Sequence, residues 1–359
     1  LKKGKAPGSD NLYAEHLIYA HSRLHVILSL LFNAMLVHGH VSDSLMETII
    51  VPLIKNRTGN CSDKNNYRPL ALCTALSKLL ELNLLQKIEK YLYTADNQYA
   101  YKSKHSTDMA VFVLKQVIEY YNKRSTPVYV CYLDASKAFD KISYWLLFKK
   151  LLKRKVPVIY VRLLVNWYVN HNYCVQWSNH KSEFFKPING VKQGGVLSPK
   201  LFIVYMDDLS KQLTKSSIGC STPYNILNHI FYADDLTLLC LSAKGMQKLI
   251  SICSSYAKSH NITFNASKTV CTVFEPKCNS SHIHPTLFLN NTEINYSSFH
   301  KYLGVLICSK NDSRDMCRQI RSYISRVNML CQMFSKCSTE VKIQLYNSYC
   351  TSMYGVHLW

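Results

Sequence analysis

The sequence predicts an α/β (α+β) fold, because segments with apolar residues at helical spacing alternate with short β-branched and aromatic runs. Hydrophobic residues make up 48% of the 359 residues, as expected for a globular core. No run of about 18 apolar residues is present, so we expect no membrane span. The chain also carries a formal net charge of +21, which favours a polyanionic partner. Nucleic acid is the first candidate; an anionic membrane surface or a merely basic protein is the alternative.

The first half of the chain contains predicted helices, strands and loops. Apolar residues at helical spacing predict helices over 13–36, 70–92 and 106–122. Apolar runs rich in β-branched residues predict strands over 46–55 and 126–134. Polar residues with Gly and Pro predict loops over 1–11 and 57–69. The strand over 126–134 is expected to be buried and to stop at Asp134.

The second half begins with helical spacing over 136–154, and residues 174–195 predict strands and turns. Ser198 and Pro199 then predict the start of a helix, since Ser caps helices and Pro suits their first turn. Two further helical stretches follow at about 312–336 and 338–354. The 14 cysteines form no Cys-x-x-Cys pair, which predicts free thiols in a reducing compartment, nuclear or cytoplasmic and not secreted.

Two pairs of adjacent aspartates suggest a metal site, because neighbouring carboxylates repel each other unless a cation neutralises them. The first pair, Asp207 and Asp208, falls within a predicted helix whose stripe repeats every four residues: Leu201, Tyr205, Leu209 and Leu213. Adjacent helical residues lie about 100° apart. We therefore expect Asp207 and Asp208 to face solvent rather than a common metal ion.

The second pair, Asp234 and Asp235, lies at a reversal between two strand-like runs, NHIFYA and LTLLCL. Taken alone, an ordinary Asp-containing turn explains it equally well. Asp134, however, also ends a buried strand. If these strands are neighbours in one sheet, three carboxylates converge, and such oxygen ligands suit Mg²⁺. Two ions there would support nucleotidyl transfer on a nucleic-acid primer.

Seven segments occur in a family-specific order: KGKAPGSDNL (3–12), VPLIKNRTGNCSDKNNYRPLALCTALSKLLE (51–81), YLDASKAFDKI (132–142), NGVKQGGVLSPKLF (189–202), FYADDLTLL (231–239), NASKTVCTVF (265–274) and KYLGVLI (301–307). Over nearly the whole chain, the sequence resembles reverse transcriptases, in particular those of LINE-type (non-LTR, jockey-like) retrotransposons. The resemblance implies a right-hand polymerase with fingers, a ferredoxin-like palm and the start of a helical thumb. It also implies an RNA-directed DNA polymerase that extends a DNA primer on an RNA template.

The resemblance assigns a metal site to this chain. Asp134 and Asp234, with Asp235 as the third carboxylate, would be the catalytic residues and would hold two Mg²⁺ ions, with Mn²⁺ as the alternative. The backbone carbonyl of Ala135 would complete the coordination. Asp140 is interpreted as an acid early in a helix, stabilised by the helix dipole, and not as a ligand.

The resemblance also assigns substrate contacts. Residues expected to bind the deoxynucleoside triphosphate are Lys55 and Arg68 at the phosphates, Phe139 beneath the sugar, Gln193 beside the sugar and Lys268 near the pyrophosphate. Residues expected to contact the template–primer are Gly194, Gly195, Tyr302, Leu303 and Gly304. A plainer reading stays open for these residues. Lys55, Arg68 and Lys268 could be solvated cations, and Phe139 could be a core residue. Gly194 and Gly195 could form a plain turn, and residues 302–304 could belong to an ordinary hairpin.

Domain ranges and partners follow from the same resemblance. We expect an N-terminal fingers extension (1–34), fingers and palm (35–307) and a partial thumb (308–359). The chain starts with Leu, so we expect a fragment whose endonuclease domain belongs to a missing N-terminal part. The alternative function is a truncated, inactive RNA-binding remnant. A maturase-type enzyme or a viral RNA-dependent RNA polymerase fits the motifs less well.

Overall fold

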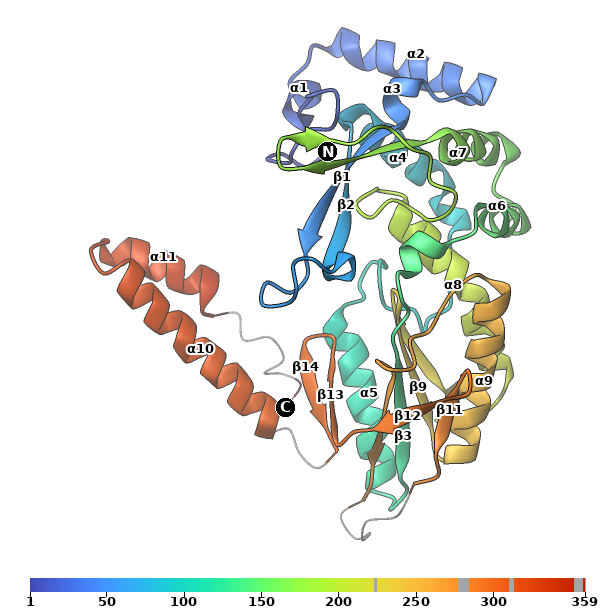
Figure 1. The fold of residues 1–359 in the computed structure, drawn as a ribbon, viewed down its shortest axis with the longest axis vertical. Coiled ribbons are helices and arrows are strands. Elements are labelled where there is room, and N and C mark those ends of the chain that lie inside the picture. The colour runs from blue at the N-terminus through green and yellow to red at the C-terminus, as the bar shows by residue number, and fades with distance from the viewer. Residues whose placement is uncertain (223–224, 277–283, 310–312, 352–357, 359) are drawn as a thin grey trace. The chain divides into compact units, whose positions relative to one another are not determined.

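The computed structural model describes residues 1–222, 225–276, 284–309, 313–351 and 358. The chain forms two compact units (Figure 1). The first unit comprises Leu1–Asp96, Ala135–Lys211 and Tyr256–Thr263, and the second comprises Asn97–Asp134, Gln212–Ser255 and Phe264–Trp359. The three predicted domain ranges stay a prediction, and residues 310–312, 352–357 and 359 of the last range lie outside the described part.

The first unit combines helices with one four-stranded sheet of order β2-β1-β4-β5. Its strands are β1 (Glu47–Ile54), β2 (Tyr67–Cys73), β4 (Asn172–Trp177) and β5 (His180–Lys181). Its α-helices are α1 (Ala14–Ile18), α2 (Ser22–His38), α3 (Asp43–Met46), α4 (Ala75–Ile88), α6 (Tyr144–Lys153), α7 (Val158–Asn170) and most of α8 (Ser198–Lys215). Three 3₁₀ turns complete it: η1 (Lys64–Asn66), η2 (Glu89–Tyr91) and η3 (Ala138–Lys141).

The second unit is built on a six-stranded sheet of order β11-β12-β10-β3-β9-β8. Its strands are β3 (Val128–Leu133), β8 (His229–Tyr232), β9 (Asp235–Cys240), β10 (Val270–Phe274), β11 (Leu287–Leu289) and β12 (Thr292–Tyr296). The four strands β10-β3-β9-β8 are antiparallel neighbours in the order of a ferredoxin-like sheet. The unit also contains the small pairs β6 (Cys220–Ser221) with β7 (Ile226–Leu227) and β13 (Phe299–Tyr302) with β14 (Val305–Cys308).

Helices of the second unit are α5 (Thr107–Asn122), most of α9 (Ala243–Ser259), α10 (Ser313–Met333) and α11 (Thr339–Tyr349). The last two run side by side as a hairpin (Figure 1). Among the described residues, no helix is both long and apolar enough to cross a membrane.

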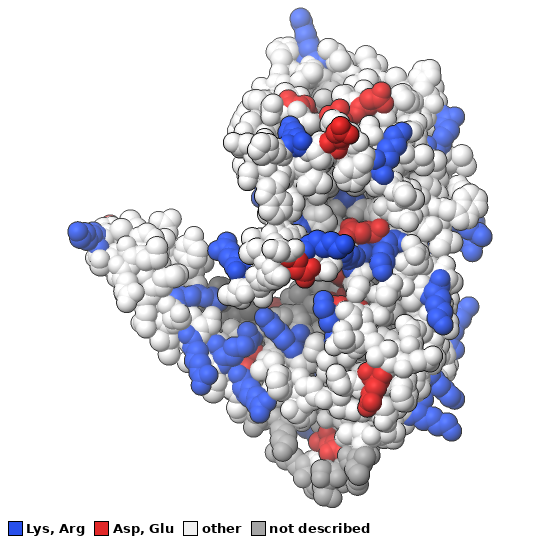
Figure 2. Space-filling view, viewed as in Figure 1, with Lys and Arg blue, Asp and Glu red and all other residues white. Residues whose placement is uncertain are grey.

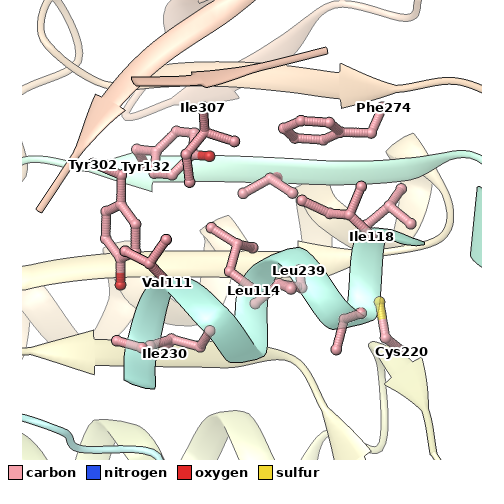
Figure 3. Packing of buried hydrophobic residues seen from close by; sticks show 14 of the residues in the cluster. Val111, Leu114, Ile118, Tyr132, Cys220, Ile230, Leu239, Phe274, Tyr302 and Ile307 are labelled. Carbon is pink, nitrogen blue, oxygen red and sulfur yellow. The ribbon is translucent and has the colours of Figure 1, made fainter. Parts of the chain in front are cut away.

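The core of the second unit lies between α5 and the sheet (Figure 3). Val111, Leu114 and Ile118 recur on one face of α5 and pack against residues of β8 and β9, among them Ile230 and Leu239. Full burial of one such side chain contributes about 1.5–3 kcal/mol. Cys253 of α9 lies near Cys131 on the opposite face of β3, so helices cover both faces of the central strand. This packing fixes the strand ends at which Asp134 and Asp235 lie.

Most predicted elements are confirmed, and one helix is wrong at its start. Residues 67–73 form β2 and pair with β1, although 70–92 were expected to be helical throughout. A short apolar run is compatible with either a strand or a helix, and here the pairing with β1 makes it a strand. The helix begins only after Thr74, whose hydroxyl accepts the Ser77 amide at 3.1 Å.

Two other predicted helices are interrupted. The segment 13–36 contains α1 and α2, separated by a break at which His21 caps α2. The segment 136–154 contains the 3₁₀ turn η3 and then α6, because Lys137 has a left-handed φ of 50° that an α-helix cannot include.

Candidate active site

The second unit brings three aspartates to one edge of its sheet. Strands β3 and β9 are antiparallel neighbours, and Leu133 is the partner of Leu236. Asp134 follows Leu133 directly, and Asp235 begins β9 beside it. Asp234 lies in the two-residue turn of the β8–β9 hairpin, where Tyr232 pairs with Asp235. The sheet register therefore gathers the carboxylates that the sequence placed at two strand ends.

The turn that carries Asp234 is held by Gln98. Ala233 has φ of 58°, a left-handed conformation that is uncommon for residues other than glycine. The Gln98 side chain, which is buried, accepts hydrogen bonds from the amides of Ala233 at 3.2 Å and Ala100 at 2.9 Å. Residues 97–99 also pair with Phe231 through their backbone. The sequence analysis missed Gln98, because a single glutamine with a long-range partner leaves no periodic signal.

The three carboxylates bring like charges close together. Burial, followed by the charges of Asp234 and Asp134, raises the pKa of Asp235 to about 6. Lys268 places its Nζ 3.9 Å from Asp134 Oδ2, and both side chains are well exposed, so this pair is weak. A divalent cation would neutralise this cluster of like charges, and the oxygen donors suit Mg²⁺.

Within the described ranges, no three or more His, Cys, Asp or Glu side chains converge closely enough to hold a metal ion by themselves. Polymerase-type Mg²⁺ sites use one or two carboxylates together with substrate phosphates and water. The arrangement of Asp134, Asp234 and Asp235 fits that kind of site, in which the substrate completes the coordination.

The raised pKa of Asp235 predicts a pH dependence of stability in metal-free protein. A carboxyl whose pKa is higher in the folded than in the unfolded chain stabilises the fold at low pH, and this contribution is lost as the pH rises through about 6. We therefore expect Asp235→Asn to raise the melting temperature at pH 7.5 but not at pH 4. Thermal melts with and without Mg²⁺ test this: the ion should raise the wild-type melting temperature at pH 7.5 and leave that of Asp235→Asn nearly unchanged. An equal effect of the substitution at both pH values would contradict the expectation.

In the first unit, the loop around Gly194 and Gly195 is tied to neighbouring segments by backbone hydrogen bonds. The Val191 amide donates to the Phe139 carbonyl at 2.8 Å, and the Ala71 amide of β2 donates to the Gln193 carbonyl at 2.7 Å. Gly194 has φ of 119°, and a Cβ there would lie 2.8 Å from the Ala71 carbonyl oxygen. Glycine is therefore required at this position by both backbone conformation and space.

Phe139, Gln193 and Asp140 lie together in the first unit. The Phe139 ring stacks on the buried Phe202 ring of α8, with centroids 4.3 Å apart and an angle of 8°. The Gln193 side-chain amide donates to Asp140 Oδ1 at 2.9 Å. Asp140 is partly buried in η3, and burial raises its pKa. The expected position of Asp140 early in a helix is confirmed by η3, whereas its stabilisation by the helix dipole and its exclusion as a metal ligand stay predictions. Ala135 is buried in the same unit, directly after Asp134 in sequence.

Lys55 and Arg68 lie on the β1–β2 hairpin. Arg68 is the cross-strand partner of Leu53, and Lys55 lies two residues beyond Leu53, so both cations project from the same face of the hairpin. Both residues are exposed. The Lys55 Nζ donates to the Asn65 carbonyl at 2.9 Å, which keeps it near the hairpin end.

Tyr302, Leu303 and Gly304 form the β13–β14 turn, and Leu303 and Gly304 both have positive φ. The Tyr302 ring is buried in the core of the second unit, 5.5 Å from the Tyr132 ring (Figure 3). Leu303 is partly exposed and Gly304 is exposed, whereas the Tyr302 ring is covered; the assignment of all three to the template–primer stays a prediction.

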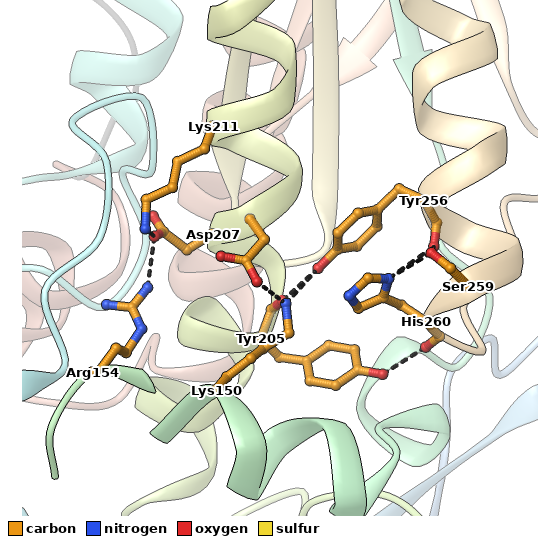
Figure 4. A network of polar contacts seen from close by, with 9 residues as sticks. Lys150, Arg154, Tyr205, Asp207, Lys211, Tyr256, Ser259 and His260 are labelled. Atoms are coloured by element: carbon orange, nitrogen blue, oxygen red, sulfur yellow. Dashed lines mark hydrogen bonds and ion pairs between the residues drawn. The ribbon is translucent and has the colours of Figure 1, made fainter. Parts of the chain in front are cut away.

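One residue of the other aspartate pair, Asp207, does not face solvent, which corrects the sequence interpretation; the Asp208 side chain is 42% exposed, and both belong to a network of polar contacts (Figure 4). The helix prediction is confirmed by α8, but Asp207 is buried, with 3% exposure. Its carboxylate pairs with Arg154 at 2.6 Å and Lys211 at 2.7 Å and accepts the Ala95 amide at 2.7 Å. Asp208 pairs with Lys150, which also donates to Tyr256. These aspartates are neutralised by side chains, not by a metal site.

Comparison with known proteins agrees with the motifs. The family model described as "Reverse transcriptase (RNA-dependent DNA polymerase)" matches residues 54–307. The chain is 24% identical over 383 residues to the "RNA-directed DNA polymerase from mobile element jockey" of Drosophila funebris, covering 99% of this chain and 40% of that protein. It is 26% identical over 287 residues to the Pol polyprotein of the retrotransposable element R2DM of Drosophila melanogaster, covering 78% of this chain and 27% of that protein. The chain thus spans about two fifths of the length of its jockey relative.

Among solved structures, apo telomerase from Candida tropicalis has a TM-score of 0.52 and 13% identity, covering 88% of this chain and 58% of that chain. This likeness confirms the predicted fold class, an α/β right-hand polymerase. The matched family model covers well over half of the chain and includes all three aspartates of the sheet edge. The chain belongs to the reverse transcriptase (RNA-dependent DNA polymerase) family.

Proposed function

We propose that this chain is the RNA-directed DNA polymerase domain of a LINE-type retrotransposon and extends a DNA primer on an RNA template. The observation that carries the proposal is the strand register that places Asp134, Asp234 and Asp235 at neighbouring strand ends in a chain of this family. The reverse transcriptase family normally uses divalent metal ions. Two such ions, Mg²⁺ or Mn²⁺, would activate the primer hydroxyl and stabilise the leaving pyrophosphate.

The chain's own residues would act as follows. Asp134, Asp234 and Asp235 hold the ions through their carboxylates, together with the carbonyl of Ala135. Lys268, which already lies near Asp134, donates a proton to the departing pyrophosphate. Gly194, Gly195, Leu303 and Gly304 present backbone at turns to the template–primer.

The incoming nucleotide is assigned to residues of the first unit. The guanidinium of Arg68 offers forked donors to phosphate oxygens, and Lys55 adds a mobile charge on the same hairpin face. Gln193 binds near the sugar. Phe139 lies beneath it and excludes a 2′-hydroxyl.

The proposed partners are an RNA template, a DNA primer and deoxynucleoside triphosphates. Lys and Arg outnumber Asp and Glu by 43 to 22, and Figure 2 shows them spread over the displayed face. Such a surface favours the phosphate backbone, and recognition of an RNA–DNA duplex by shape. An endonuclease activity carried elsewhere in a longer protein stays part of this proposal.

Primer extension tests the proposal. The chain is incubated with a DNA primer annealed to an RNA template, deoxynucleotides and Mg²⁺, and the products are resolved by length. Extension that depends on the RNA template and stops on chelation with EDTA supports the proposal. Binding of the template–primer without any extension would instead support the inactive RNA-binding remnant.

Phe139→Val is expected to relax sugar selection. The ring is held flat against Phe202, so it cannot move aside for an extra oxygen, and removing it opens space for a 2′-hydroxyl. We expect the ratio of ribonucleotide to deoxynucleotide kcat/KM to rise roughly 10- to 100-fold. Single-nucleotide incorporation with each substrate measures it. Phe184→Val, an exposed control, should leave the ratio unchanged, and an unchanged ratio in Phe139→Val would contradict the assignment.

A further inference from the structure

A single buried carboxylate closes the loop that carries Gln193. Glu81 lies on α4 and is 2% exposed. Its Oε1 pairs with the Lys192 Nζ at 2.9 Å, and its Oε2 accepts the backbone amides of Val196 and of Leu197, the latter at 3.0 Å. Lys192 precedes the Gly194–Gly195 pair, and Val196 follows it. Glu81 therefore holds both ends of the glycine turn at one point.

The glycine turn is shaped around this carboxylate. The Gly195 amide donates to the Lys192 carbonyl at 3.2 Å, which closes the turn locally. A Cβ at Gly195 would lie 2.7 Å from Ser198 Oγ and 3.3 Å from Glu81 Oε2. The absence of a side chain at Gly195 thus lets the loop approach Glu81 closely enough for both backbone hydrogen bonds.

Lys192 is buried with its partner and remains charged. Its Nζ lies 4.5 Å from the centroid of the Trp167 ring, and the residue is 4% exposed. Burial, the largest single influence, would lower the pKa of Lys192, but the charge of Glu81, the neighbouring Cys73 and the hydrogen bond to Glu81 together raise it. The neighbouring His171 stays neutral, because burial and the Lys192 charge lower its pKa to about 2. The pair is therefore a fixed pair of charges inside the first unit.

A buried ion pair is a poor source of net stability, because an apolar pair of similar volume is often as stable. An apolar pair would, however, leave the backbone amides of Val196 and Leu197 without an acceptor and would remove the ionic link between α4 and position 192 of the loop. We propose that Glu81, together with Lys192, is a positioning residue for nucleotide selection: it fixes the loop so that Gln193 stands correctly for the incoming deoxynucleotide. This inference rests on the proposed polymerase function and adds two residues to it.

The test compares Glu81→Gln, the double variant Glu81→Gln/Lys192→Met and a control, Asp207→Asn. Asp207 also belongs to a buried ion pair of the first unit, and its polar partners Arg154, Lys211 and Ala95 lie outside the loop. Glu81→Gln keeps the side-chain size but sets an amide against the buried ammonium. The double variant removes that unpaired charge and so keeps the test open if Glu81→Gln does not fold.

Two readouts are measured for each variant. Hydrogen exchange of the amides of Val196 and Leu197, followed by mass spectrometry of this segment, reports whether the loop is held and needs no activity. Single-nucleotide incorporation reports KM for the deoxynucleotide and kcat per active site. For Glu81→Gln we expect exchange of these amides to speed up about tenfold or more, and kcat/KM to fall about 10- to 100-fold, mainly through KM. For Asp207→Asn we expect a smaller fraction of folded, active protein, with KM and kcat per active site unchanged.

The outcomes are distinct. Loosened amides with raised KM in either Glu81 variant support the proposal. Unchanged exchange would show that Glu81 does not hold the loop, and faster exchange with an unchanged KM would show that the held loop does not serve the nucleotide; either result overturns it. A wild-type chain without extension would instead refute the polymerase function, while the exchange experiment would still decide whether Glu81 holds the loop.

Discussion

Asp234→Asn is expected to lower the rate of primer extension by roughly 10³-fold or more, because metal stabilisation of the transition state is worth several kcal/mol. The amide has the size of the carboxylate but carries no charge, so it is a poor ligand for a divalent ion. It also relieves the repulsion among Asp134, Asp234 and Asp235, so the fold should not suffer. Binding of the RNA template should persist, because backbone contacts by Lys and Arg do not involve this carboxylate.

The measurement is single-turnover extension at saturating Mg²⁺, with template binding and the melting temperature recorded for the same preparations. Asp43→Asn is the matched control, because Asp43 is an exposed aspartate at the start of α3 in the first unit, far in sequence from the strand ends and from Gln98. It should extend like the wild type. If Asp234→Asn extended at the wild-type rate, the metal assignment at the β8–β9 turn would be refuted.

The carboxylates of the site could be predicted because their signals are local. Asp134 ends a buried apolar run, and Asp234 and Asp235 interrupt two strand-like runs, so each residue is placed by its immediate neighbours. The only long-range step was the pairing of β3 with β9, and the sheet has that pairing. The catalytic roles of these residues remain a proposal, because the end of a strand determines where a side chain lies and does not determine which reaction it serves.

The residues that hold the site were missed for the opposite reason. Gln98 acts on Ala233 across 135 residues, and Glu81 acts on Val196 across 115 residues. A buried polar side chain with distant partners produces no periodicity and no change of composition, and although Glu81 ends the segment 51–81, nothing in that segment indicates what it binds. Such contacts depend on which segments pack together, and local spacing carries no information about that.

The sequence does contain an indication that Asp207 is buried, but the stripe of Leu201, Tyr205, Leu209 and Leu213 pointed to the opposite conclusion. Residues 201–206, Leu-Phe-Ile-Val-Tyr-Met, are all apolar, so α8 is hydrophobic on every side at this point. A helix that is apolar all round is buried, and an aspartate that follows such a run can be buried with it. The stripe of Leu201, Tyr205 and Leu209 is real, but it does not leave the other faces of α8 open to water.

Asp207→Asn is therefore expected to damage the fold and not the chemistry. The substitution leaves the Arg154 guanidinium, whose side chain is 7% exposed, without its charged partner. Breaking a buried ion pair from one side costs about 3–5 kcal/mol. That is a large part of the roughly 5–15 kcal/mol that separates a folded domain from its unfolded chain. The Lys211 partner is half exposed, so its loss adds little.

Urea denaturation of the wild type, Asp207→Asn and Asp207→Leu/Arg154→Met measures this effect. Because the double variant removes both charges from the buried site, it should recover part of the lost stability, although the Ala95 amide then lacks its acceptor. In protein that remains folded, extension per active site should equal that of the wild type, whereas Asp234→Asn should be folded and inactive. A stable Asp207→Asn protein without extension would reverse the assignment of the two aspartate pairs. The opposite pattern, lost stability at Asp207 and lost chemistry at Asp234, would establish that the two similar Asp-Asp sequences serve different ends: the first binds the buried cations Lys150 and Arg154 and holds the fold, and the second serves the reaction.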